Sequence, residues 1–219
     1  MLILGVTTST AAVGVAVWCD DEVLSVQQVR TDRRHAEELT PMLAQVLADA
    51  GVEVSDIDRL AVDVGPGRFT GMRVGLATVR ALAFAVDCPV VGITSLELLA
   101  AAVPERPVVA VIDARRNEVF QQAFSETSTG PARVGTPSSL MSDVPDHALV
   151  VGDGADRYRD LYAAAPGAAR ILADQDPQAA ILVRLAASRV ASPGRTIEPV
   201  YLRDPDVQIN IKTRPNETS

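Results

Sequence analysis

Residues 63–73 read DVGPGRFTGMR and join an apolar segment to a helix expected from near Phe69 to about Val86. Gly65 and Gly67 permit backbone angles that a side chain would forbid, and the proline between them has a fixed φ. Thr70 stands where a side chain can cap the first turn of the helix or meet an anion at its positive end. The stretch therefore predicts a tight turn that exposes a helix N-terminus. Such units are equally typical of α/β proteins that bind no ligand at this point.

Apolar alternation and helical spacing predict the elements around this turn. Strands are expected over Leu2 to Val6, Val13 to Trp18, Val23 to Val29, Leu60 to Val64 and Val90 to Ile93, and helices over Ala36 to Ala50 and from Thr94 or Ser95. Three strands, a helix, a strand and a helix form the ribonuclease-H-like order. The first half of the chain is therefore predicted to be one α/β unit.

The second half has weaker signals. Pro104 to Pro107 indicates a boundary, and beyond it strands are expected over Val108 to Ile112, Glu118 to Phe124 and Leu149 to Val151, with a helix over Ala179 to Val190. We predict two subdomains, residues 1–103 and a smaller, reduced one at 104–206. A polar tail at 207–219 is expected to be disordered.

Composition narrows the class of protein. The chain has 219 residues, 47% of them hydrophobic and only 4% aromatic, so its core must be built from Ala, Val, Leu and Ile. Cys19 and Cys88 are too few for a disulfide framework. No apolar run is expected to reach the roughly 18 residues that span a bilayer, and the first strand lacks a basic leader region. These features predict a cytoplasmic protein without a membrane contact.

The charge balance is acidic. Twenty basic and 28 acidic residues give a net charge of −8, which repels polyphosphate backbones at long range. We therefore expect no direct nucleic-acid binding by the chain on its own. Two small basic clusters, Arg30 with Arg33 and Arg34, and Arg115 with Arg116, are interpreted as solvated faces in preference to phosphate contacts.

Five motifs, in order along nearly the whole chain, resemble the TsaB (YeaZ) family. They are MLILGVTTST at residues 1–10, HAEELTP at 35–41, GPGRFTGMRVG at 65–75, VIDARRNEVF at 111–120 and PVYLRDPD at 199–206. The family consists of small bacterial paralogues of the TsaD/Kae1 proteins in the actin–sugar kinase–Hsp70 superfamily. The resemblance therefore implies an α/β, actin-like ATPase fold with two subdomains.

Chemistry typical of that superfamily is incomplete in this sequence. Active members carry a carboxylate in the first strand–turn–strand unit, and Thr7 stands at that place here. A hydroxyl cannot supply the negative charge that a Mg²⁺-bound phosphate site favours. Asp113 is the best remaining acid, but a turn residue bonding its own backbone is the preferred interpretation. Asp63 is interpreted equally well as a functional group or as a surface acid. The residues expected nearest to any nucleotide are Thr7, Thr8, Gly65, Gly67, Thr70, Arg73 and Asp113.

Metal ligands and nucleophiles are not recognisable in the sequence. The TsaD-like paralogues bind metal through a His-x-x-x-His pair on one helix face. This chain has only His35 and His147, and Leu39 occupies the position four residues after His35. His35 is interpreted as a helix-start or interface residue. We predict no catalytic residue and no metal site.

Two helices offer a different role. On the second helix, Gly71, Gly75, Thr78, Leu82 and Ala85 share one face, and Met72, Leu76, Val79 and Ala83 form another apolar strip. Both helices would cover their own sheet in an ordinary α/β protein. A helix that is apolar on two sides needs a second partner, and family members use these helices as an interface. The predicted partner interface comprises His35, Leu39, Met42, Leu43, Val46, Met72, Gly75, Leu76, Val79 and Ala83.

The resemblance implies a non-catalytic subunit in the modification of transfer RNA. Its partner would be a TsaD-like protein that transfers a threonylcarbamoyl group to the adenosine beside the anticodon, with a TsaE-like ATPase in the same complex. Alone, the chain would form a homodimer. ATP or ADP would be placed near the subunit junction, and no nucleotide site is assigned to this chain by itself. The alternative is a small ATP-dependent kinase or phosphohydrolase of the same fold, against which Thr7 argues.

Overall fold

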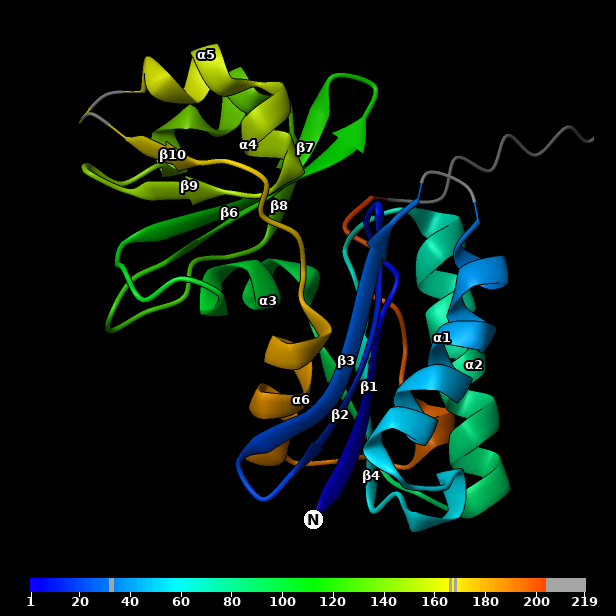
Figure 1. Cartoon of the computed structure of the whole chain (residues 1–219). Helices are drawn as coiled ribbons and strands as arrows, with labels where there is room; N and C mark the ends of the chain where they lie inside the picture. The colour runs from blue at the N-terminus through cyan, green and yellow to red at the C-terminus, as the bar shows by residue number, and fades with distance from the viewer. Residues whose placement is uncertain (32–33, 166, 168, 204–219) are drawn as a thin grey trace, which may run out of the picture.

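The computed structural model describes residues 1–31, 34–165, 167 and 169–203, which form two subdomains, each built around a five-stranded sheet (Figure 1). The predicted tail at 207–219 and Arg33 lie outside the described residues. The first subdomain contains β1 (Leu2–Thr7), β2 (Ala12–Cys19), β3 (Glu22–Arg30), α1 (His35–Ala50), η1 (Val54–Asp56), β4 (Arg59–Asp63), α2 (Phe69–Val86), β5 (Val90–Ile93) and α3 (Ser95–Ala101).

The first sheet has the strand order β3-β2-β1-β4-β5. The three leading strands pair antiparallel as hairpins, whereas β4 is parallel to β1 and β5 is parallel to β4. Parallel pairing follows because α1 and α2 carry the chain back across one face before each new strand. The predicted ribonuclease-H-like order is confirmed.

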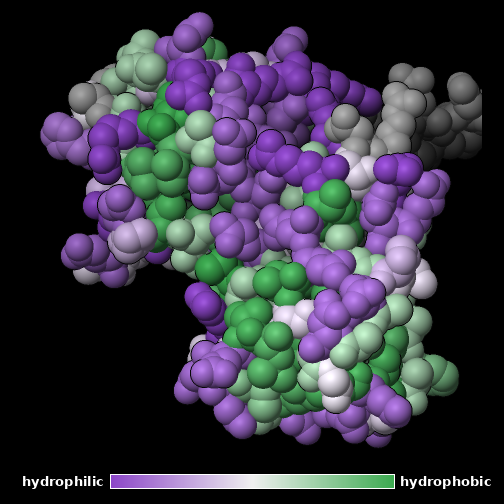
Figure 2. Space-filling model, in the orientation of Figure 1, coloured by the Kyte–Doolittle hydropathy of each residue, from purple (hydrophilic) through white to green (hydrophobic). Residues whose placement is uncertain are grey.

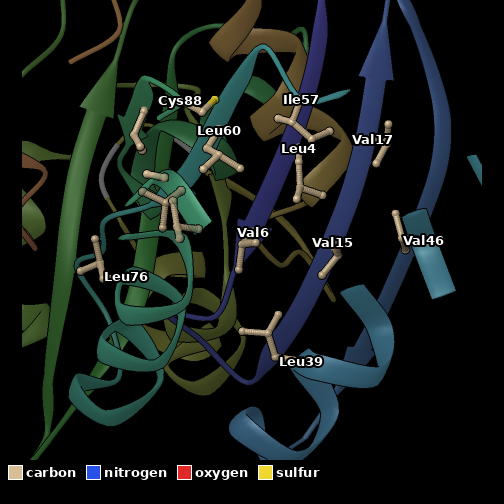
Figure 3. Packing of buried hydrophobic residues seen from close by; sticks show 14 of the residues in the cluster. Leu4, Val6, Val15, Val17, Leu39, Val46, Ile57, Leu60, Leu76 and Cys88 are labelled. Carbon is tan, nitrogen blue, oxygen red and sulfur yellow. The ribbon is translucent and has the colours of Figure 1, made fainter. Parts of the chain in front are cut away.

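Side chains alternate between the two faces of this sheet. Leu4 and Val6 of β1 pack with Leu39 of α1 and Leu76 of α2, as Figure 3 shows. The opposite face presents Ile3, Ala16 and Ala61 to α6 (Ala179–Ala187). The first sheet is therefore buried on both sides.

The position of α6 differs from the prediction. The sequence placed this helix in the second subdomain, but Leu182, Val183 and Ala186 pack on the first sheet. Its apolar stripe needs a sheet face to cover, and α1 and α2 leave one face of the first sheet open. The chain thus returns to the first subdomain after crossing the second, so the predicted boundary at 104–206 is wrong for α6.

Residues 188–203 form a C-terminal strap along the first subdomain. The strap pairs with β5 through Ser192 and Val90, and its short helix η3 (Gly194–Thr196) lies against α2. The Val200 N–H then donates to the Val64 carbonyl, and Leu202 packs against the core of the second subdomain. The strap therefore ties α2 to both subdomains.

The second sheet has the order β10-β9-β6-β7-β8. Its elements are β6 (Val108–Arg115), β7 (Glu118–Phe124), β8 (Arg133–Gly135), η2 (Pro137–Asp143), β9 (Leu149–Val151), α4 (Asp153–Arg157), α5 (Arg159–Ala163) and β10 (Arg170–Leu172). The strands β8 and β10 and the helices α4 and α5 were not predicted. Each has only three to five residues, too few for a periodic pattern.

The helix residues predicted to contact a partner are mostly buried in the chain's own core. All of them except Leu43 are buried, and Leu43 is half-buried: His35, Leu39, Met42, Val46, Met72, Gly75, Leu76, Val79 and Ala83. The apolar strip of Met72, Leu76, Val79 and Ala83 on α2 is buried within the chain's own fold, where α2 contacts its sheet, α1 and the strap, so this strip needs no other molecule. These residues therefore form the chain's own core, and the prediction that they contact a partner is wrong.

One helix also alters the expectation about membrane-spanning runs. By length and composition alone, α2 could cross a membrane, contrary to the expectation that no run would qualify. Core helices of soluble proteins meet the same criteria. Met72, Leu76 and Val79 of α2 are buried in an α/β fold, and Arg73 and Arg80 lie on its outer side.

Candidate functional site

The glycine loop rests directly on the turn between β1 and β2. A Cβ added to Gly67 would lie 2.1 Å from the Ser9 carbonyl oxygen, and one added to Gly71 would lie 2.1 Å from that of Thr8. The Thr8 hydroxyl donates to the Gly71 carbonyl over 2.8 Å. Glycines are therefore required here because two backbone segments meet without room for a side chain.

We expect the replacement of Gly71 by alanine to lower the free energy of unfolding by about 2–3 kcal/mol, since a backbone carbonyl must move to admit the methyl group. Thr70→Ala is the matched control on the same helical turn, because Thr70 is exposed and caps nothing; the N-cap residue is Arg68. The control should change stability by less than about 0.5 kcal/mol. Urea unfolding followed by circular dichroism measures both, and equal losses would contradict the steric explanation.

Behind the loop, Asp63 lies in a closed ring of hydrogen bonds. It is fully buried, and its two carboxyl oxygens contact the hydroxyls of Ser9 and Ser95, the latter at 2.6 Å. The two hydroxyls lie 2.7 Å apart, and the Gly65 N–H also donates to the carboxyl. Burial raises the pKa of Asp63, while these hydrogen bonds oppose the rise. The interpretation of Asp63 as a surface acid is wrong.

Two predicted polar residues are also buried around the first turn. The His35 Nε2 lies 2.7 Å from the Thr10 carbonyl oxygen, so the His35 imidazole holds the β1–β2 turn in place. Thr7 Oγ1 is buried with no hydrogen-bond partner among the described residues. No group of three His, Cys, Asp or Glu side chains within the described part of the chain is arranged to hold a metal ion.

In front of the loop lies a pocket with a volume of about 590 Å³. The glycine loop and the start of α2, the β6–β7 turn and the end of the strap form its walls. Its lining comprises Pro66, Gly67, Arg68, Phe69, Met72, Arg73, Asp113, Ala114, Arg115, Arg116, Phe120, Val200, Tyr201, Leu202 and Arg203. Apolar walls with charged groups in this size range are typical of ligand sites.

Asp113 organises the β6–β7 turn. Its Oδ1 accepts from the Arg115 N–H at 3.0 Å, which confirms the interpretation as a turn residue bonding its own backbone. Its Oδ2 lies 3.3 Å from Arg115 Nη1 and 3.2 Å from Arg157 Nη1. The Asp113 N–H in turn donates to Asp153, whose carboxyl pKa burial raises. Asp113 thus positions Arg115 at the pocket.

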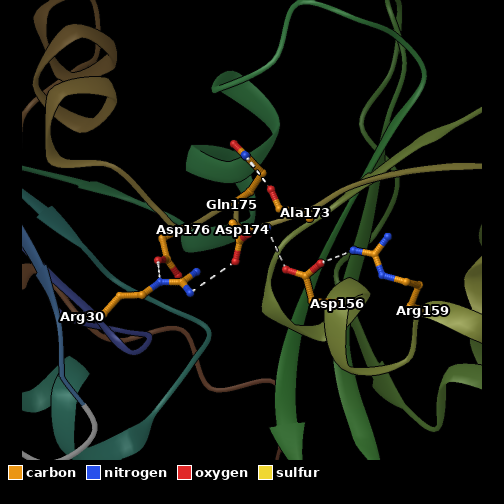
Figure 4. Close-up of polar contacts among 7 residues, drawn as sticks. All are labelled: Arg30, Asp156, Arg159, Ala173, Asp174, Gln175 and Asp176. Atoms are coloured by element: carbon orange, nitrogen blue, oxygen red, sulfur yellow. Dashed lines mark hydrogen bonds and ion pairs between the residues drawn. The ribbon is translucent and has the colours of Figure 1, made fainter.

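A second charged group joins the subdomains elsewhere (Figure 4). Arg30, at the end of β3, pairs with Asp176 and lies 3.7 Å from Asp174. Asp156 of α4 accepts from the Asp174 N–H and from Arg159. Arg30 is therefore a link between β3 and the connection to α6, while Arg34 pairs with Glu38.

The structure brings together only part of the predicted nucleotide-proximal set. Gly67, Arg73 and Asp113 line the pocket. Thr7, Thr8 and Gly65 are buried outside the lining, and Thr70 is exposed beyond it. The aromatic residues Phe69, Phe120 and Tyr201 were missed as site residues, although the motifs at 65–75, 111–120 and 199–206 contain them.

Comparison with known proteins finds relatives that match this chain over most of its length. The family model described as TsaD, tRNA N6-adenosine threonylcarbamoyltransferase, matches residues 26–132. An uncharacterized protein of Mycobacterium tuberculosis is 35% identical over 94% of this chain and 93% of its own length. The tRNA threonylcarbamoyladenosine biosynthesis protein TsaB of Escherichia coli is 29% identical over 93% of this chain and 95% of its own.

A solved structure is similar over most of this chain. It is a Pseudomonas aeruginosa protein described as similar to peptidase YeaZ, with a TM-score of 0.80 and 30% identity. The alignment covers 92% of this chain and 99% of the other. An alignment over so much of the chain includes residues of both subdomains.

Proposed function

This chain belongs to the TsaB (YeaZ) family, and on that premise we propose that it is a non-catalytic subunit that docks to a TsaD-like threonylcarbamoyltransferase. Relatives bearing the TsaB name are proteins of tRNA threonylcarbamoyladenosine biosynthesis, so the chain has its role in that pathway. The proposed task is to bind the catalytic subunit and to stabilise its active arrangement. A TsaE-like ATPase would join the same assembly in the cytoplasm.

The observation that carries this proposal is the outer face of α1 and α2, which differs from the face predicted from sequence. On α2, Ala77, Ala81 and Ala85 are exposed at intervals of four residues, and Phe84 beside them is 91% exposed. Thr40, Ala44 and Ala48 form the same kind of row on α1. We call these seven residues the alanine face.

Small side chains at this spacing let another helix approach closely, as in helix–helix packing generally. A phenylalanine left almost fully in water gains by burial against a partner. Figure 2 shows hydrophobic side chains among hydrophilic ones along the side of the first subdomain that α1 and α2 cover. A helix pair of the partner, or of a second copy of this chain, fits such a surface. A stable pairing would bury about 1,600 Å² in total.

The rival proposal of a kinase or phosphohydrolase has less support. Thr7 is buried in the place where the superfamily carries an acid, and a Cβ added to Gly14 on the paired strand would lie only 2.8 Å from its Oγ1. We therefore assign no ATP site to this chain alone and place ATP or ADP, when present, at the junction with the partner. Mg²⁺-ATP turnover by the purified chain would favour the kinase or phosphohydrolase proposal.

Light scattering after size-exclusion chromatography tests the docking proposal directly. The purified chain should elute as a homodimer, and an equimolar mixture with its cognate TsaD-like protein should elute as a heterodimer. A mixture that elutes as two separate species at micromolar concentration would overturn the proposal. The same measurement on the partner alone supplies the reference mass.

A further inference from the structure

The pocket in front of the glycine loop reverses the charge of the chain locally. The whole chain carries −8, whereas the pocket is lined by five arginines and one aspartate. Arg115 and Arg116 are exposed at the tip of the β6–β7 turn, and Arg73 lies on the opposite wall. A cluster of this sign attracts anions even on an acidic protein, because screening limits the reach of distant carboxylates to about 10 Å.

Two aromatic rings stand inside this arginine cluster. The rings of Phe69 and Tyr201 have centroids 5.5 Å apart, and the residues are 50% and 45% exposed. The Arg73 guanidinium lies 3.6 Å from the Phe69 ring centroid, and its Nε donates to the Tyr201 hydroxyl over 3.4 Å. The start of α2 and the strap hold the two rings in place, so they offer a preformed platform on which a flat group can stack.

Three backbone donors in and beside the glycine loop are already engaged within the chain. The Gly65 N–H donates to Asp63, the Arg68 N–H donates to the Ser9 carbonyl, and the Met72 N–H donates to the Arg68 carbonyl. Sites for a free di- or triphosphate use such donors together around one anion. Arginine side chains on separate walls of the pocket offer further anion contacts, an arrangement that suits spaced phosphodiesters.

We propose that this pocket binds single-stranded RNA. An unpaired base stacks on Phe69 and Tyr201, and flanking phosphates contact Arg115 and Arg116. Stacking platforms beside basic side chains are the usual chemistry of single-strand binding. The choice of RNA rests on the proposed function, because the pathway acts on transfer RNA. The net charge still predicts weak affinity for the isolated chain, so binding should be measured at low salt.

Fluorescence anisotropy with a 5′-labelled anticodon stem–loop RNA tests the proposal on the full-length chain. We expect Tyr201→Ala to weaken binding about tenfold. The double variant Arg115→Gln/Arg116→Gln should weaken it by at least tenfold and lower the slope of log K against log salt by about 0.7 per lost phosphate contact. The double variant Arg184→Gln/Arg195→Gln removes the same charge from exposed positions outside the pocket lining and should bind as the unchanged chain does.

Three outcomes would overturn the proposal: equal binding by the pocket and control variants, equal binding of a fully paired RNA of the same length, or displacement of the RNA by ATP or ADP at its own dissociation constant. The last would assign the pocket to a free nucleotide. Association with the TsaD-like protein, measured in parallel, should be unchanged in Arg115→Gln/Arg116→Gln. A failure of RNA binding is thereby separated from a failure of docking.

Discussion

Replacing Ala81 with glutamate is expected to weaken association with the TsaD-like subunit by more than about a hundredfold. The residue is exposed at the centre of the row Ala77, Ala81 and Ala85 on α2. A carboxylate there would have to be desolvated without a partner when a helix packs against the row, which costs about 3 kcal/mol or more. Phe84→Ser is expected to weaken association as well, by removing the most exposed phenylalanine of the same face.

The matched control is Ala163→Glu on α5, an exposed helical alanine of the second subdomain. It should leave the dissociation constant and the free energy of unfolding unchanged. Isothermal titration calorimetry of each variant, with thermal unfolding as the check on folding, makes the comparison. Full-affinity binding by Ala81→Glu would move the docking surface away from the alanine face.

Charged replacements at Leu39 or Val79, two residues of the interface predicted from sequence, do not test docking. Both side chains are almost fully buried in the first core cluster. A carboxylate at either position would be an unpaired buried charge, so the variant would lose its fold before its interface could be measured.

The architecture was predictable because strong periodicity marked its principal elements. Helices α1 and α2 and all five strands of the first sheet were predicted, and Gly51 ends α1 with a φ of 68°, as expected of a helix C-cap. The Thr94 hydroxyl likewise accepts from the Glu97 N–H at the start of α3. Local sequence patterns therefore carried this part of the prediction, and the observed caps agree with them.

The outward face of α2 was not predictable by the same reasoning. The helix is apolar on several sides, and the side that faces water depends on what covers the others. The strap supplies part of that cover: a Cβ added to Gly194 would lie 2.4 Å from that of Ala83. A contact between residues more than a hundred positions apart leaves no periodic signal, so buried positions were taken for an interface.

Contacts between residues far apart in sequence also form the pocket and the hydrogen-bond ring around Asp63, so neither was predictable from periodic patterns. Ser9, Asp63 and Ser95 come from three different parts of the chain, and only the fold places their oxygens together. The motifs contained every lining residue of the pocket, but nothing in their spacing showed that Tyr201 would lie against Phe69.

The ring predicts that Asp63 is protonated in the folded protein. Three oxygen–oxygen contacts join the carboxyl and the hydroxyls of Ser9 and Ser95, and the two hydroxyls supply only two hydrogens. A proton on the carboxyl completes the set, and full burial favours this neutral form. We therefore expect Asp63→Asn, whose amide offers one donor and one acceptor in the same places, to cost about 1 kcal/mol. Asp63→Ala should cost about 3 kcal/mol or more, because it leaves a hydroxyl and the Gly65 N–H without partners.

The pH dependence of the free energy of unfolding gives a second test of the hydrogen-bond ring around Asp63. Burial raises the pKa of Asp63 above its ordinary 3.8, so the folded state keeps a proton that the unfolded chain has already released. The stabilising contribution is thus complete below about pH 3.8 and falls as the pH rises towards the raised pKa, at up to about 1.4 kcal/mol per pH unit. Asp63→Asn cannot titrate and therefore lacks this loss of stability with pH. The unfolding free energies of the unchanged protein and of Asp63→Asn should therefore converge as the pH rises. A difference that grows with pH instead would show a charged carboxylate in the ring, and the proton count proposed for it would be wrong.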